Sequence, residues 1–84
     1  MENPSINITV RGYLGFEIYT RCLPDKGSLT ISSGSKIKDV LDIMLMPMGL
    51  QSNMAIFING RLAELESLLK ENDEAVFFPN MEGG

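Results

Sequence analysis

A single stretch of this chain, residues 35–48, has the spacing of an amphipathic helix, and short strand-like segments lie on both sides of it. Its apolar positions recur three and four residues apart, at Ile37, Val40, Leu41, Met44 and Met48. Ser35 is the expected N-cap, because its hydroxyl can accept a hydrogen bond from a free N–H of the first turn. Pro47 predicts that the helix ends near Met46, and Gly49 supports that stop. One helix cannot enclose a core alone, so the other elements are expected to form a sheet.

Five segments are predicted to be strands: Ser5–Val10, Ser28–Ser32, Met54–Ile58, Arg61–Leu65 and Glu74–Phe78. The first two alternate polar and apolar residues, which is typical of strands with one buried face. The third is apolar throughout, so both of its faces are expected to be covered. Asn59-Gly60 favours a type I′ hairpin, because both of its central positions need a positive φ. Pro79 should end the last strand, since proline cannot donate to a ladder.

The connecting segments carry weaker signals. Phe16–Tyr19 could pair as a short strand within the loop-like stretch from Gly12 to Gly27. Ser67–Leu69 could form a helical turn, and Glu71–Glu74 a polar turn. One helix on one face of a mixed sheet gives an α+β two-layer domain, in which the first and last strands could lie side by side at the centre. We therefore expect a single domain over residues 1–78.

Composition argues against several classes of function. The net charge of −4 disfavours nucleic-acid binding, because that binding requires Lys and Arg to neutralise phosphates. The chain has no histidine and one cysteine, Cys22, so the usual zinc sites and Cys-His or Ser-His catalysis are not expected. Cys22 is interpreted as an incidental thiol rather than a nucleophile. Glu71, Asp73 and Glu74 lack the spacing of a calcium loop and are interpreted as a solvated turn.

The sequence carries no sign of a membrane or of secretion. No apolar run reaches about 18 residues, the minimum for a spanning helix. Residues 1–11 have no basic start followed by an apolar block, so no signal peptide is predicted. A lone cysteine is consistent with a reducing compartment. We expect a cytoplasmic protein without a membrane partner.

The segment after the last predicted strand, residues 79–84, reads Pro-Asn-Met-Glu-Gly-Gly. Six extended residues can reach about 20 Å from the folded body. Two terminal glycines make this end thin and mobile, so the segment is predicted to be a flexible tail. At average glycine usage a random chain ends in Gly-Gly about once in 200, so the signal is moderate by itself, and an expression scar is the alternative. Here it follows a compact domain.

Several motifs together make the chain resemble the MoaD/ThiS family of sulfur carriers. They are the helix start 34–41 (GSKIKDVL), Asn59-Gly60-Arg61-Leu62, the leucines Leu65, Leu68 and Leu69, the stretch 72–79 (NDEAVFFP) and Gly83-Gly84. The resemblance extends from about Ser28 to Gly84 and is weak over 12–27. It implies a β-grasp, ubiquitin-like fold. The Phe-Phe-Pro end of the last strand looks more like MoaD, the small subunit of molybdopterin synthase, than like ThiS. Asn80 and Glu82 depart from the MoaD pattern, which often has a second proline and a small residue there.

The resemblance also implies a chemistry for the tail. An activating partner of the E1-like type (MoeB or ThiF) would adenylate the carboxylate of Gly84 with ATP, and sulfur would displace AMP to give a thiocarboxylate. A large synthase subunit of the MoaE type would hold a pterin precursor that receives the sulfur, forming molybdopterin. The carrier itself would bind no cofactor and no metal. Gly83 and Gly84 would be small enough to enter a narrow channel.

A partner-binding surface is implied as well. The family positions that match Leu62 and Phe78 lie on the sheet face away from the helix and contact partners. Arg61, Pro79 and Met81 complete the expected surface. The alternative is that Phe78 belongs to the core. The methionines between Met44 and Met54 are expected to fill the helix–sheet core, although methionine can also line adaptable docking surfaces.

Three functions remain open at this point. The first is a MoaD-like carrier within a synthase. The second is a thiocarboxylate carrier for thiamin or another sulfur pathway. The third is a protein modifier joined through its terminus to lysines, as ubiquitin is. An independent enzyme is the weakest interpretation, because no acid/base or nucleophile constellation is present.

Overall fold

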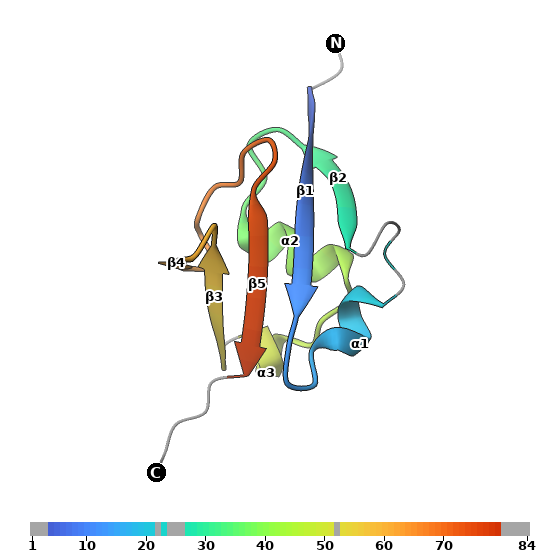
Figure 1. Ribbon diagram of the computed structural model, residues 1–84, viewed down its shortest axis with the longest axis vertical. Helices are drawn as coiled ribbons and strands as arrows, with labels where there is room; N and C mark the ends of the chain where they lie inside the picture. Colours follow the sequence, from blue (N-terminus) through green and yellow to red (C-terminus); the bar gives the residue numbers. More distant parts are fainter. Residues whose placement is uncertain (1–3, 22, 24–26, 52, 80–84) are drawn as a thin grey trace.

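The computed structural model describes residues 4–21, 23, 27–51 and 53–79 (Figure 1). Five strands make one sheet: β1 (Ser5–Gly12), β2 (Ser28–Ser32), β3 (Met54–Ile58), β4 (Arg61–Ala63) and β5 (Glu74–Pro79). Three helices accompany it: α1 (Glu17–Thr20), α2 (Ile37–Ile43) and α3 (Met48–Gln51). All five predicted strands are present, although β4 ends two residues earlier than expected.

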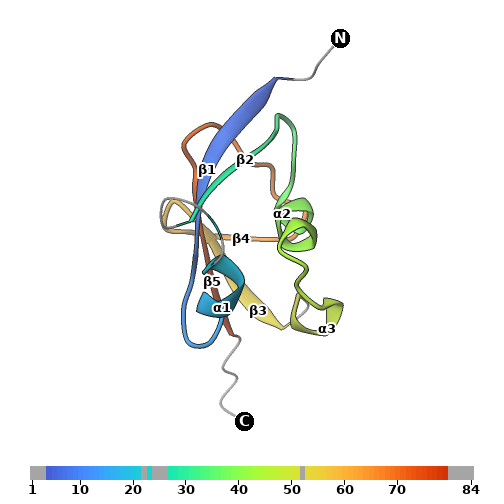
Figure 2. The ribbon, with the colours of Figure 1, turned by 90° about the vertical axis from the view of Figure 1, so that its right-hand side faces the viewer.

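The sheet order is β2-β1-β5-β3-β4, so the first and last strands are neighbours. β1 and β5 run parallel, with Val10 opposite Ala75 and Gly12 opposite Phe77, and the other pairs are antiparallel. The predicted side-by-side placement of the two strands is therefore confirmed, as is the mixed sheet. Helix α2 lies across one face of the sheet (Figure 2), which gives the expected two layers.

The core lies between α2 and the sheet. Its most buried side chains come from the helix and from the strand positions that face it: Ile8, Val10, Ile37, Val40, Leu41, Ile56, Ala75 and Phe77. Each of these is at most 4% exposed. The alternation predicted for β1 is confirmed, because Ile8 and Val10 point inward while Asn7 and Arg11 are exposed. No helix within the described part of the chain is long and apolar enough to cross a membrane.

Helix α2 begins differently from the prediction. Lys36, not Ser35, is the N-cap residue, and its N–H donates to the Asp39 carboxylate at 2.9 Å. Ser35 contributes a backbone contact, in which its carbonyl accepts from the Leu69 N–H at 3.0 Å. That bond ties the helix start to the segment before β5.

The same region overturns one further prediction and bears out another. Residues 67–69 do not form a helical turn, because the Ser67 carbonyl accepts from Ile37 N–H at 3.0 Å and Leu68 forms a bridge with Lys36. The backbone there is extended to reach the helix start. The polar turn at 71–72 is present as predicted.

The end of α2 is also earlier than predicted. Leu45 adopts a φ of +59°, and the N–H groups of Leu45 and Met46 donate to Asp42 and Leu41, both at 3.0 Å. This is a Schellman turn with leucine where glycine is usual. It buries Met46 while leaving Leu45 85% exposed. The chain then continues as α3, so Gly49 lies within a short helix rather than at a stop.

The methionines are only partly in the core. Met46 is buried, and Met44 and Met54 pack against the core. Met48 is 81% exposed, so the expectation of a core role was wrong there. Its position on α3, after the sharp turn at Leu45, directs it outward, because the α2 spacing on which the prediction rested does not extend past that turn.

The segment after β1 was predicted to be loop-like, with Phe16–Tyr19 as a possible short strand, and residues 17–20 of it are helical. Leu14 and Gly15 make a turn with positive φ, and α1 follows. A side chain at Gly12 would collide with the backbone carbonyl of Phe16, so the chain passes closely over itself here. This return buries Phe16 at 6% exposure, which a strand pairing would not achieve.

Candidate functional site

The sheet face opposite α2 carries a group of apolar side chains that no described helix or strand covers (Figure 1, where α2 lies behind the sheet). Residues directly opposite one another in a ladder share a face. Ala55 is opposite Phe78, and Phe57 is opposite both Val76 and Leu62. Tyr13 joins them just beyond β1, where its ring stacks on Phe78. We call this group the apolar half: Tyr13, Ala55, Phe57, Leu62, Val76 and Phe78.

The rest of the same face is polar. Asn7 lies opposite Thr30, and Thr9 lies opposite Ser28. The Thr30 hydroxyl donates to the Asn7 side-chain carbonyl at 2.7 Å. We call the β1–β2 part of this face the polar half. The prediction that Met54–Ile58 is covered on both faces was therefore wrong for one face, because the side of β3 that carries Ala55 and Phe57 is open.

Phe78 is the centre of the apolar half. Its ring centroid lies 5.3 Å from that of Tyr13, with the planes at 16°, and 5.9 Å from that of Phe57, with the planes at 87°. Both are favourable aromatic arrangements. The three rings line a shallow hollow of about 520 Å³ together with Gly60, Glu74 and Val76. Phe78 is half-buried, and Leu62, on the far side of β3, is 75% exposed.

One ion pair marks the boundary between the two halves. Arg11 Nε donates to Glu74 Oε2 at 2.7 Å, linking β1 to β5. The hydrogen bond and the charge of Glu74 raise the pKa of Arg11 further above its ordinary value. Both side chains are exposed, so this ion pair adds little stability. It places charged groups beside the apolar half.

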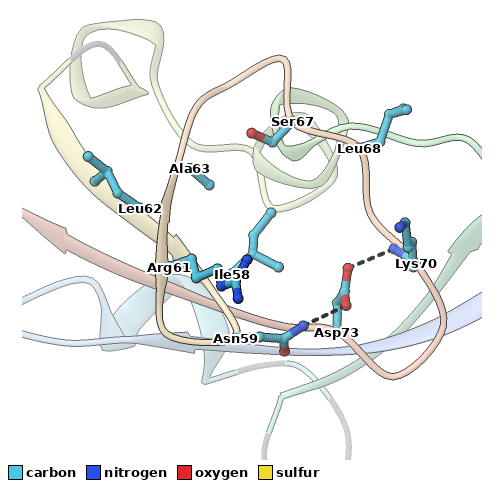
Figure 3. A pocket seen from close by; sticks show the side chains of 9 residues that line it. All are labelled: Ile58, Asn59, Arg61, Leu62, Ala63, Ser67, Leu68, Lys70 and Asp73. Atoms are coloured by element: carbon cyan, nitrogen blue, oxygen red, sulfur yellow. Dashed lines mark hydrogen bonds between the residues drawn. The ribbon is translucent and has the colours of Figure 1, made fainter.

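A second hollow of about 560 Å³ lies at the β4 edge (Figure 3). We call it the edge hollow: Ile58, Asn59, Arg61, Leu62, Ala63, Ser67, Leu68, Lys70 and Asp73. Its floor is fixed by Asp73, whose carboxylate accepts from Asn59 Nδ2 and from the Lys70 N–H, both at 2.8 Å. Asn59 and Gly60 have φ of +53° and +84°, which confirms the predicted type I′ hairpin.

The structure brings two of the predicted partner-binding residues together and separates a third. Leu62 and Phe78 lie on the same open face, and Pro79 is the last residue of β5, opposite Met54. Arg61 follows the opposite alternation and belongs to the edge hollow. Met81, Gly83, Gly84 and Cys22 lie outside the described residues.

Four members of the apolar half were missed by sequence reasoning: Tyr13, Ala55, Phe57 and Val76. The alternation within β3 and β5 could have identified Phe57 and Val76, because both share the parity of Phe78 across the ladder. No comparable signal points to Tyr13, which follows β1 in a loop. Within the described part of the chain, no group of three or more Cys, Asp or Glu side chains is arranged to hold a metal.

Comparison with known proteins gives a likeness in fold. No family model matches the chain, and no curated protein matches it. Among solved structures, a Haloferax volcanii protein is 17% identical, with a TM-score of 0.72 over 100% of this chain and 92% of that one. Small archaeal modifier protein 1 from H. volcanii is 14% identical, with a TM-score of 0.66 over 90% and 99%.

A third similar structure is a complex. It contains subunits 1 and 2 of the molybdopterin-converting factor from Helicobacter pylori, and the match is 22% identical, with a TM-score of 0.56 over 94% of this chain and 100% of that one. Together with the strand order and the single covering helix, these likenesses identify the fold as β-grasp, as the sequence predicted.

Proposed function

We propose that this chain is a ubiquitin-like sulfur carrier, a co-substrate rather than a catalyst, whose reacting group is the C-terminal carboxylate of Gly84. The observation that carries the proposal is the continuity of β5 with the Gly-Gly segment. Phe78, the centre of the apolar half, is followed by Pro79 and then by the five residues that end in Gly83-Gly84. A partner that binds the apolar half would thus have the Gly84 carboxylate within about 17 Å of Pro79, the length of five fully extended residues.

The chemistry requires activation, because a carboxylate is anionic at neutral pH and a poor electrophile. In the proposed reaction, a Gly84 oxygen attacks the α-phosphate of ATP and pyrophosphate leaves, giving an acyl adenylate on an E1-like partner. A sulfur donor then attacks the carbonyl carbon, AMP leaves, and a thiocarboxylate remains. These steps take place on the partner, in the cytoplasm. The carrier supplies the terminus and the docking surface.

The sulfur acceptor in this proposal is a pterin precursor held by a large synthase subunit, as in molybdopterin formation. The support is the fold likeness to subunit 1 of the H. pylori molybdopterin-converting factor, which was solved bound to subunit 2. The Phe-Phe-Pro end of β5 agrees with that assignment. A thiocarboxylate carrier for thiamin or another sulfur pathway is the alternative within the same chemistry.

A second candidate is a protein modifier that is joined to lysines through Gly84. The fold likeness to small archaeal modifier protein 1 favours it. Both candidates share adenylation, and they diverge at the acyl acceptor, which is sulfur in one case and a lysine amine in the other. Conjugates that disappear when Gly84 is deleted would favour the modifier.

The test is intact-mass measurement after incubation with the activating enzyme of the same organism, ATP and a sulfide source. We expect a mass gain equal to the exchange of one oxygen for sulfur, located on Gly84 by fragmentation. An unchanged mass, with the enzyme active on another carrier, would contradict the sulfur-carrier proposal.

A variant of the terminus sharpens this test. Gly84→Ala should retain the fold and slow ATP–pyrophosphate exchange, because a Cβ narrows the fit to a channel and restricts the backbone. Gly84→Val should slow it more. Equal exchange rates for the three chains would refute the steric role of the terminal glycine.

A further inference from the structure

The edge hollow holds two cations whose charges are not matched. Arg61 and Lys70 line it from opposite sides (Figure 3), and neither side chain forms an ion pair with a described residue. Three other described cations are paired, since Arg11 contacts Glu74 and both Lys36 and Lys38 contact Glu66. The contrast indicates a local positive site on a protein whose net charge is −4.

The one acidic side chain of the hollow is already engaged. Asp73 is 9% exposed, and its two oxygens accept from the Asn59 amide and the Lys70 backbone N–H. The carboxylate therefore holds the hairpin against the segment before β5. It does not contact the Arg61 guanidinium or the Lys70 ammonium. Both cations remain available to an anion from outside.

The walls of the hollow add apolar contact next to the charges. Ile58 and Ala63 form part of its lining, and Leu68 is 58% exposed at its rim. A small inorganic anion would leave these aliphatic surfaces unused. The lining fits a carboxylate whose neighbours along a chain are aliphatic.

The edge of β4 offers a backbone partner in the same place. β4 has β3 on one side only. The pair that closes a two-residue hairpin, here Ile58 and Arg61, is hydrogen-bonded, and bonded pairs alternate with unbonded ones. Leu62 therefore directs its N–H and C=O away from β3. An extended segment laid along this edge could exchange hydrogen bonds with Leu62, as in strand addition.

Such a segment would alternate its side chains between two surfaces that meet at β4. One set would face the edge hollow, with Arg61 and Lys70. The other set would face the apolar half, where Leu62 and Phe57 lie opposite each other in the ladder. Leu62 borders both surfaces. Because the two surfaces meet at β4, the bound segment should alternate acidic residues, which face the edge hollow, with aliphatic residues, which face the apolar half.

We propose that the β4 edge binds an extended acidic segment of a partner protein, with a Glu or Asp carboxylate between Arg61 and Lys70. This goes beyond the proposed function, because it does not require the Gly84 carboxylate or any sulfur transfer. It supplies a second point of contact for a partner seated on the apolar half. It also gives charge selectivity to a surface that is otherwise apolar.

The test uses the full-length chain labelled with ¹⁵N and an acetylated, amidated peptide of alternating Glu and Val. We expect shifts of backbone amide signals concentrated at Leu62, Leu68 and Lys70. The matched peptide with Gln in place of Glu should bind at least tenfold more weakly. Added salt should weaken binding of the Glu peptide, because the contact is an exposed ionic one.

Charge-reversal variants locate the contact. Arg61→Glu should reduce the affinity for the Glu peptide at least tenfold. Arg21→Glu makes the same change in net charge at the end of α1, on the far side of the sheet from β4 (Figure 1), and should have little effect. Dispersed spectra of both variants would establish that they fold.

Three outcomes would overturn the proposal: no binding to the unsubstituted chain, equal losses in the two variants, or shifts centred on the other open edge at Leu29 and Ile31. Gly84→Ala should bind the peptide normally. Failure of the sulfur-carrier chemistry and failure of this docking site are therefore distinguishable.

Discussion

β3 and β5 carry apolar side chains on both faces, and the described residues cover only one of these faces. Phe77 and Phe78 are neighbours in sequence and point to opposite sides of β5. Phe77 is 0% exposed beneath α2, whereas Phe78 is half-buried between Tyr13 and Phe57 on the open face. Folding accounts for the first phenylalanine, since it fills the core. It does not account in the same way for the second, which has no covering layer.

The polar half shows what an open face of this sheet needs for folding alone. β1 and β2 present Asn7, Thr9, Ser28 and Thr30 there and still form a regular ladder. An open face of this sheet can therefore form without aromatic residues, so folding alone does not explain those on the apolar half. Exposed apolar patches of this kind commonly mark interaction sites. The difference between the two halves supports a partner as the missing cover.

The largest effect should separate the two phenylalanines. Phe77→Ala removes a fully buried ring, and such changes cost about 3–5 kcal/mol of unfolding free energy. Phe78→Ala removes a half-exposed ring and should cost less than half of that. Urea unfolding of both variants measures the difference. Equal losses would mean that the open face is a second core, and the comparison between the faces would fail.

The next effect concerns binding. Leu62→Ala and Phe78→Ala should each weaken binding to the proposed activating or synthase partner by about 1–2 kcal/mol, or roughly 5- to 30-fold, as central apolar contacts do. Thr30→Ala on the polar half is the matched control and should leave the affinity unchanged. Titration calorimetry with the isolated partner gives the three values. A loss of affinity in the Thr30 variant as large as in the other two would remove the distinction between the halves.

A smaller effect should appear in the covering layer alone. Leu45 holds a φ of +59° at the end of α2 and is 85% exposed, so Leu45→Gly should relieve about 1 kcal/mol of backbone strain at little packing cost. Leu45→Ala keeps the strain and should not stabilise. Thermal unfolding compares them. Because this turn lies on the covered side, partner affinity should stay constant, and a change in affinity would show that the two faces are coupled.

The smallest effect is a pH dependence on the covered side. Hydrogen bonds from Lys36 and Lys38 lower the pKa of Glu66 below its ordinary value of 4.5. The folded-state pKa is thus below the unfolded one, so the stabilisation is present above about pH 4.5 and is lost as the pH falls through the folded value. Glu66→Gln should be slightly less stable at pH 7 and match the unsubstituted chain in strong acid. A constant difference across this range would contradict the assignment.

Local chemistry explains what could be predicted of the fold. The Asn59-Gly60 turn, the alternation in β1 and the existence of strand β3 are set by neighbours in sequence, and the structure confirms them. Ser35 failed as an N-cap because the helix starts later, at Ile37, whose N–H donates to the carbonyl of Ser67, thirty positions away. The short strand considered possible at 16–19 did not form, because Gly12 allows the chain to fold back and bury Phe16. These outcomes depend on tertiary contacts that no local pattern contains.

The candidate site divides in the same way. The shared face of Leu62 and Phe78 was anticipated from a family resemblance, and strand register gives the physical reason for it. Tyr13 reaches Phe78 only because β1 and β5 are parallel neighbours and end at the same side of the sheet. Arg61 and Leu62 are adjacent in β4 and point to opposite faces of the sheet, so they do not share the open face. The binding roles of these residues, and the chemistry of Gly84, stay predictions.

The central position of β5 also governs when the molecule can fold. This strand lies between β1 and β3 in the sheet, yet it is the last strand along the chain. On the ribosome, β1, β2 and α2 are made long before β5, the strand that joins them to β3 and β4. Domains generally fold as units, and long-range pairings are slow to form. The nascent chain should therefore stay open until translation has passed Pro79. Premature termination before that point would leave a fragment exposed to proteolysis, and no folded domain.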